Sequence, residues 1–205
     1  MAYLFEVTVS NSVNDQTQNV PGKFGTNTGS SFAPAVCQAG TLCIKNGLIP
    51  SEGYEDFEIL NGNTWYFNAT TANVIPAGMT GDHTGIYAFN NYDVNKATDT
   101  AGNSWNVGAN TLGISLPSGE RGDFTELRVG EQYTWGTSNF TAAVSTNKYA
   151  TIAADGKWTP AASVPATSGV VYGEILRTKN INEGTSFVDT GYVMVIKRAA
   201  VSAGA

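Results

Sequence analysis

Charge is the first property that this sequence has little of. Charged residues make up 14% of the 205 residues, against about a quarter in an average soluble domain. The 17 acidic and 11 basic residues give a net charge of -6, and no cluster of Lys or Arg is present that could neutralise a row of phosphates. Direct binding to nucleic acid is therefore not expected.

Long apolar segments and a secretion signal are also missing. No uninterrupted apolar run reaches the roughly 18 residues that are needed to span a bilayer. The segment from Met1 to Ser10 has no basic stretch followed by an apolar one. We expect neither membrane insertion nor classical secretion.

Cysteine is limited to Cys37 and Cys43. Their spacing is not that of a C-x-x-C redox pair or of half a zinc knuckle. The favoured interpretation is two partly buried thiols in a reducing cytoplasm. A disulfide across a tight hairpin is the alternative that stays open.

Histidine occurs once, at His83, in the polar stretch from Gly81 to Gly85. Hydrolases of the Ser/His/Asp and Cys/His types need an imidazole as base, so any such chemistry would have to pass through this residue. No nucleophile elbow, phosphate-binding loop or dinucleotide-binding glycine motif occurs. We therefore predict no catalytic residues and interpret His83 as a loop histidine.

Clusters of acidic residues suggest two further chemistries, and both are weak. A glycosidase needs two facing carboxylates, but the acidic residues near position 55 fit the solvent side of a strand that buries Phe57 and Ile59. A calcium-binding loop would use oxygen ligands. One region offers such ligands, but their spacing is not that of an EF-hand: Asp93, Asn95, Asp99 and Asn103. We predict no metal and no cofactor.

What the chain has instead is the composition of strands and turns, rich in Gly, Thr, Asn, Ser and Ala. Alternation of apolar and polar residues predicts a strand over 3–10. Asn61-Gly62 and Asp155-Gly156 each supply the pair of residues that a two-residue hairpin turn requires. Further strand candidates are Ile86–Phe89, Leu127–Val129, Gln132–Trp135 and Val170–Leu176.

The segment Tyr192–Ile196 is apolar on both faces and predicts a central strand. The longest stretch without Gly or Pro, Thr137–Asp155, shows no sustained helical periodicity. The predicted fold is all-β, an antiparallel β-sandwich or barrel-like domain with little or no helix.

The polar segment 11–35 predicts an extended arm after the first strand, because it contains only scattered apolar residues. Such arms become ordered across a neighbouring subunit, and Val20, Phe24 and Phe32 are the candidate partner-binding side chains. We expect three regions: an amino-terminal strand and arm over 1–35, an all-β body over 36–198, and a flexible tail over 199–205. A division of the body into subdomains 36–120 and 121–198 stays open.

The carboxy-terminal third resembles the head decoration, or cement, proteins of tailed bacteriophages. The resemblance covers roughly 70 residues and is carried by the segments Leu127–Thr134, Asn139–Val144, Tyr149–Trp158, Gly173–Leu176 and Gly191–Ile196. It does not extend to Met1–Gly119, which could be an added outward-facing domain.

The resemblance implies a non-enzymatic virion protein, made in the host cytoplasm, that binds the outside of an assembled capsid. It would bridge major capsid protein subunits and form a homo-oligomer, with a trimer favoured. A carbohydrate- or receptor-binding β module of a phage tail fibre is the alternative, which predicts aromatic side chains exposed together at one end. A glycan-degrading enzyme ranks third.

Overall fold

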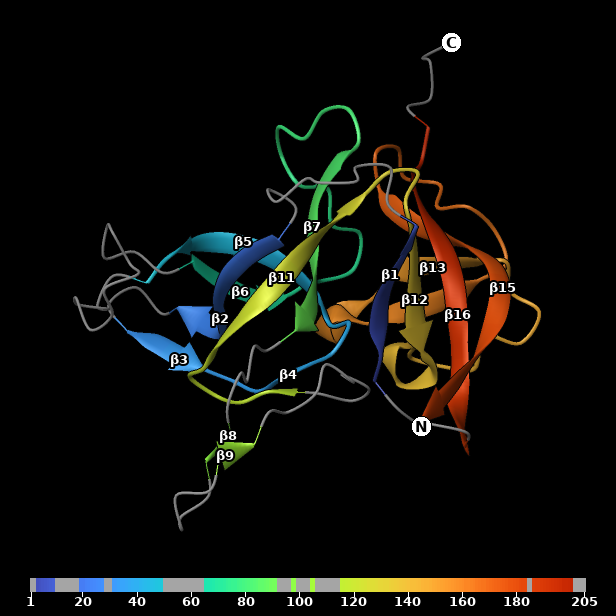
Figure 1. The fold of residues 1–205 in the computed structure, drawn as a ribbon. Helices are drawn as coiled ribbons and strands as arrows, with labels where there is room; N and C mark the ends of the chain where they lie inside the picture. The colour runs from blue at the N-terminus through green and yellow to red at the C-terminus, as the bar shows by residue number, and fades with distance from the viewer. Residues whose placement is uncertain are drawn as a thin grey trace.

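The strands of the protein divide between a closed barrel and an open sheet (Figure 1). The computed structural model describes residues 3–9, 19–27, 31–49, 65–91, 97–98, 104–105, 115–183 and 186–200. Within these ranges the regular structure is almost entirely strand, as the composition predicts. No helix in the described part of the chain has the length and apolar character needed to cross a bilayer.

The barrel closes because β11 pairs with two neighbours, β7 on one side and β2 on the other. Around the ring, β2 and β6 run parallel, and the other neighbours run antiparallel. Short strands add to this unit: β3 (Phe32–Pro34) pairs with the end of β2, and β4 (Cys37–Gln38) pairs with β10 (Ser115–Leu116). The strands of the ring are, in order, β2 (Asn19–Asn27), β11 (Arg121–Arg128), β7 (His83–Asn91), β5 (Leu42–Leu48) and β6 (Trp65–Ala69).

The open sheet is antiparallel throughout and combines the two ends of the chain. Two short 3-10 helices lie in its connections, η2 (Thr137–Asn139) and η3 (Ala154–Gly156), and a two-stranded pair stands apart from it, β8 (Ala97–Thr98) with β9 (Ser104–Trp105). The order across the sheet is β1 (Phe5–Val9), β12 (Gln132–Gly136), β16 (Ser186–Arg198), β15 (Val171–Glu183), β13 (Tyr149–Ile152) and β14 (Trp158–Ala161).

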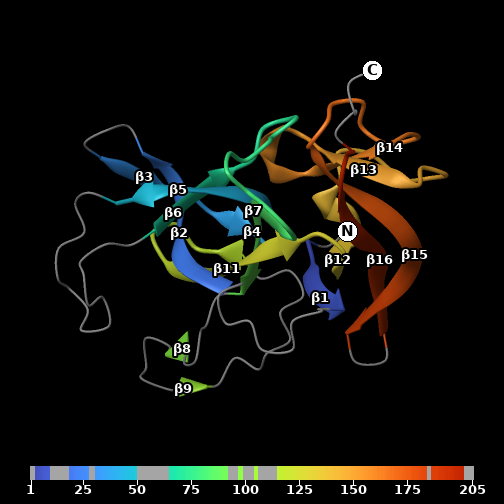
Figure 2. The same ribbon diagram turned by 90° about the horizontal axis from the view of Figure 1, so that it is seen from above.

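The sheet packs against one wall of the barrel, as the view from above shows (Figure 2). Strand β7 has a core on each side, since its side chains alternate between the two faces. Ile86 and Ala88 join the core shared with the sheet, which includes Trp135 and Trp158, while Tyr87 and Phe89 point into the barrel. The wall strands therefore carry both hydrophobic cores.

Several sequence-based predictions are confirmed. Strand β16 pairs with both β12 and β15, and Val193, Met194 and Ile196 are buried within it, as expected for a central strand. The predicted hairpin is present, because Ile152 pairs with Trp158. Its loop is longer than the two residues expected: Asp155 and Gly156 both have positive φ, but they form the short helix η3 with Ala154.

Other segments differ from expectation. Residues 19–27, expected within a polar arm, form β2, which is held by β11, β6 and β3. Strand β11, which ends at Arg128, still belongs to the barrel, and the strands that follow it belong to the sheet. The barrel therefore gives way to the sheet after Arg128 rather than at residue 120. The sheet also takes β1 from the other end of the chain. The predicted turn at Asn61-Gly62, the strand before it, residues 10–18 and residues 201–205 lie outside the described residues.

Candidate functional site, a buried network of charged side chains

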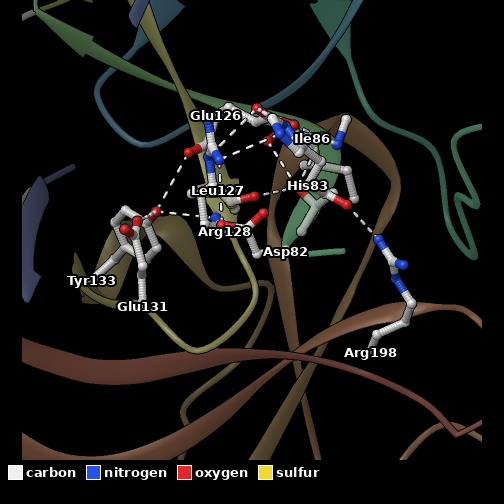
Figure 3. A network of polar contacts seen from close by, with 11 residues as sticks. Asp82, His83, Ile86, Glu126, Leu127, Arg128, Glu131, Tyr133 and Arg198 are labelled. Carbon is white, nitrogen blue, oxygen red and sulfur yellow. Dashed lines mark hydrogen bonds and ion pairs between the residues drawn. The ribbon is translucent and has the colours of Figure 1, made fainter. Parts of the chain in front are cut away.

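Charged side chains meet at one end of the barrel, where β7 begins and β11 ends. These strands are antiparallel, and Arg128 lies opposite His83, with a register shift between Glu126 and Arg128. A bulge of this kind re-aims side chains along a strand. It brings Glu126, Arg128 and His83 into contact beside Asp82 (Figure 3).

Glu126 is the centre of the network. Its Oε2 atom lies 3.0 Å from His83 Nδ1 and 3.8 Å from Arg128 Nε, and its Oε1 atom accepts a hydrogen bond of 3.0 Å from the backbone N–H of Gly85. Arg128 Nη1 lies 3.3 Å from Asp82 Oδ2. Glu126 and Arg128 are buried, whereas Asp82 and the His83 ring are about half exposed to solvent. The inner pair, Glu126 and Arg128, is thus shielded from water, whereas the outer pair, Asp82 and His83, borders the solvent.

Tyr133 and Arg198 connect this network to the open sheet. The Tyr133 hydroxyl donates to Glu131 Oε2 over 2.5 Å and accepts from the backbone N–H of Arg128 over 3.1 Å. From β16, the Arg198 guanidinium donates to the carbonyl oxygen of His83. The network (Asp82, His83, Glu126, Arg128, Glu131, Tyr133 and Arg198) therefore joins the barrel to the sheet.

The geometry around His83 favours a structural role, as a contact between the barrel and the sheet, over the role of a general base. A base needs a ring nitrogen that faces the proton it removes, but Nδ1 faces Glu126 and Nε2 lies 3.4 Å from Arg128 Nη1. The neighbouring hydroxyl of Thr84 is engaged with the main chain, since it donates to the Leu127 carbonyl and accepts from the N–H of Ile86. The prediction that the chain is not an enzyme stays a prediction.

Metal binding finds no support in the described part of the chain. There, no three His, Cys, Asp or Glu side chains are grouped so that they could hold a metal ion. The possible calcium ligands Asp93, Asn95, Asp99 and Asn103 lie outside the described residues.

The two cysteines are free thiols buried at the barrel. Burial raises the pKa of the Cys43 thiol well above its ordinary value, and the neighbouring Cys37 adds to this effect. A thiol whose thiolate is disfavoured is a poor nucleophile, so this pair suits packing better than catalysis.

The predicted partner-binding residues are only partly available at the surface. Val20 and Phe24 are partly buried and pack against the barrel core. Phe32 is half-buried, and its ring centroid lies 5.9 Å from that of Tyr66. Two of the three side chains therefore help to hold β2 in the barrel.

Sequence reasoning missed the charged network, although one signal was present. Glu126, Arg128 and Glu131 lie in the predicted strand region between Phe124 and Trp135, among apolar residues such as Leu127 and Val129. Charges inside a strand that is covered on both faces are almost always paired. What the pattern could not supply is the partner, since His83 and Asp82 lie more than forty residues earlier.

Tyr87 provides a pH-dependent test of this region. Burial, followed by the charge of Glu126, raises the pKa of its phenol to about 12, with Arg128 acting in the opposite direction. A raised pKa means that the folded state favours the protonated form, so this contribution to stability is complete below pH 10 and is lost as the pH rises toward about 12.

We therefore expect the urea concentration at the midpoint of unfolding to decrease as the pH is raised from 10 to about 12 in the native protein. The decrease should be smaller in Tyr87→Phe. The measurement is a series of urea titrations across that range. Parallel losses in both proteins would show that Tyr87 does not control alkaline stability.

Comparison of the chain with family models, with curated proteins and with solved structures finds no match.

Proposed function

We propose that the chain is a non-enzymatic structural protein of a bacteriophage particle, bound to the outer surface of the assembled capsid. In this role it bridges major capsid protein subunits and stabilises the shell. The protein is made in the host cytoplasm and acts as a homo-oligomer, with a trimer favoured.

One observation carries the proposal. The segments that resemble decoration proteins are separated in sequence, yet they contribute to β12, β13, β14, β15 and β16, which are neighbours in one sheet. Their buried side chains share one core, which includes Tyr133, Trp158 and Met194. Apart from Leu127 and Arg128, which end β11, the strand residues that carry the resemblance thus fall on a single sheet, and the rest of the barrel lies outside it.

The physical mechanism is stabilisation by mass action. A protein that binds the assembled shell, and not free capsid subunits, lowers the free energy of the assembled state. A rigid binder suits this role because little conformational entropy is lost on docking. The shared core of the sheet and the barrel, with the charged network that joins them, supports such a binder.

Co-sedimentation with the empty capsids of the candidate phage tests this proposal. We expect the protein to pellet with the shells and to saturate at a fixed number of copies per shell. A protein that stays in the supernatant at every shell concentration would exclude the role.

The tail-fibre alternative has one observation in its favour. Trp65 is 36% exposed, and Lys45 Nζ lies 4.4 Å from the centre of its ring. By contrast, Trp135 and Trp158 are fully buried. Binding to a glycan array, lost in Trp65→Ala, would favour this alternative.

A further inference from the structure

Strands β15 and β16 form a hairpin that is longer than its neighbours in the sheet. The two strands pair with each other over their whole length. By contrast, β13 pairs only with Tyr172–Glu174 of β15, and β12 pairs only with Gly191–Val195 of β16. Residues 176–183 and 186–190 therefore continue past both neighbouring strands, toward the bottom of Figure 1. We call this part the hairpin extension.

The outer edge of the hairpin extension is open. Ile175 still donates its N–H to the carbonyl oxygen of Lys148 over 2.8 Å. Beyond Ile175, no strand in the described part of the chain pairs with the side of β15 that faces away from β16. The five consecutive residues Leu176–Asn180 are all exposed to solvent. An edge of this kind can accept a further strand through its main-chain hydrogen-bonding groups.

Contacts with the rest of the molecule hold the hairpin extension in place. Lys179 Nζ lies 2.7 Å from Glu6 Oε2 on β1. The Thr137 hydroxyl donates a hydrogen bond of 2.6 Å to Asp189 Oδ2 on β16. Ile181 is buried although its neighbours in sequence up to Asn180 are exposed. The edge is thus formed before any partner binds, which lowers the entropy lost on binding.

The open edge carries positive charge. Residues 175–182 contain Arg177 and Lys179 but no Asp or Glu, although the chain has a net charge of -6. Lys179 pairs with Glu6, whereas Arg177 makes no ion pair with any residue in the described ranges. Leu176, which is 44% exposed, adds an apolar side chain beside this cation. The edge is therefore complementary to a partner strand that carries carboxylates.

The charge of the whole chain is divided in the same way. Residues 1–128, which form the barrel and β1, have 5 basic and 12 acidic residues, a net charge of -7. Residues 129–205, which form the rest of the sheet, have 6 basic and 5 acidic residues, a net charge of +1. An acidic partner is therefore attracted to the sheet and repelled by the barrel.

We propose that the open edge of β15 at Leu176–Asn180 is the docking surface for the capsid, and that its occupant is an extended acidic segment of the major capsid protein. This segment adds to β15 as a further strand: main-chain hydrogen bonds hold it, and its carboxylates face Arg177. Nucleic acid fits this edge less well, because a row of phosphates needs a cluster of cations. The inference rests on the proposed function and names the surface that makes its contact.

Co-sedimentation of charge variants with the empty capsids of the candidate phage tests the docking surface. Arg177→Glu should raise the dissociation constant for shells at least about tenfold, and Arg177→Gln should raise it less. Arg121→Glu is the matched control, since it reverses the charge of an exposed arginine at the end of β11 that lies away from the sheet. The control should bind as the native protein does. Urea midpoints equal to the native value would show that each variant is folded.

Hydrogen exchange gives a second readout. The main-chain amides of Leu176–Asn180 that face the open edge should exchange more slowly in the shell-bound protein than in the free protein, because a docked strand occupies them. Added salt screens the attraction between opposite charges. The affinity of the native protein for shells should therefore fall as the salt concentration rises, and it should fall less in Arg177→Glu.

The outcomes separate the docking surface from the proposed function. Shell binding with equal affinities for Arg177→Glu and Arg121→Glu, or without protection of Leu176–Asn180, would overturn the docking surface and leave the proposed function in place. A native protein that binds no shell would exclude both. If Arg177→Glu instead lost self-association or binding to duplex DNA, with shell binding unchanged, the edge would belong to another occupant and the inference would be wrong.

Discussion

Gly156→Ala is expected to lower the free energy of unfolding by about 2–5 kcal/mol. Gly156 has a φ of +67°, a left-handed conformation that costs an L-residue about 1–2 kcal/mol. A Cβ atom there would also lie 2.5 Å from the carbonyl oxygen of Leu42 and 2.7 Å from Thr41 Cγ2. Overpacking of this kind costs about 1–3 kcal/mol. The effect should be large because the β13–β14 hairpin meets the barrel wall at this residue.

Gly81→Ala separates the two causes. Gly81 has a φ of +65°, close to that of Gly156, but nothing lies within 4 Å of its Cβ position. Urea unfolding of both variants should therefore show a loss of only about 1–2 kcal/mol for Gly81→Ala. Equal losses in the two variants would mean that the hairpin tip is not pressed against Leu42.

Arg128→Met is expected to destabilise the protein by about 3–5 kcal/mol. The change removes the guanidinium that faces Glu126 and Asp82 and leaves the buried Glu126 carboxylate without that charge partner. Breaking a buried ion pair from one side is costly because the remaining charge stays desolvated. The methionine side chain preserves most of the apolar packing, so the loss reports the charge.

A double-variant cycle isolates the interaction energy between Glu126 and Arg128. Glu126→Gln combined with Arg128→Met should cost clearly less than the sum of the two single changes, because the second change removes the uncompensated charge. Lys179→Met serves as the control, since it breaks the exposed pair of Lys179 with Glu6 and should cost no more than about 1 kcal/mol. An Arg128→Met loss as small as that of the control would contradict the structural role of the network.

The parts of the fold that could be predicted from sequence have local causes. The central strand at Tyr192–Ile196 follows from a run that is apolar on both faces, which β16 confirms with neighbours on both sides. The hairpin at Asp155-Gly156 follows from the stereochemistry of positive φ, which both residues adopt. Neither prediction needs information from distant parts of the chain.

The parts that could not be predicted depend on distant partners. The sequence of β2 was interpreted as a polar arm because it contains few apolar residues. The segment forms a strand through its pairing with β11, about a hundred residues later, and through its parallel pairing with β6. Its alternating Val20 and Phe24 were a faint signal of this. In the same way, the pairing of β1 with β12 joins segments more than a hundred residues apart.

The candidate site shows the same limit. His83, interpreted from the sequence as a loop histidine, is the first residue of β7, and its two ring contacts come from Glu126 and Arg128 on β11. The bulge between Glu126 and Arg128 decides which side chains meet, and no residue in that stretch marks it. Local patterns could therefore predict the elements of this site, and only the tertiary structure brings them together.

The heat stability of the shell is the most direct test of the central claim, that this protein stabilises an assembled capsid by binding to it. Empty capsids should be heated in a calorimeter with increasing amounts of the protein. We expect the capsid transition to move to higher temperature and to stop moving once the binding sites are full. A transition that stays in place while the protein is bound would contradict a stabilising role.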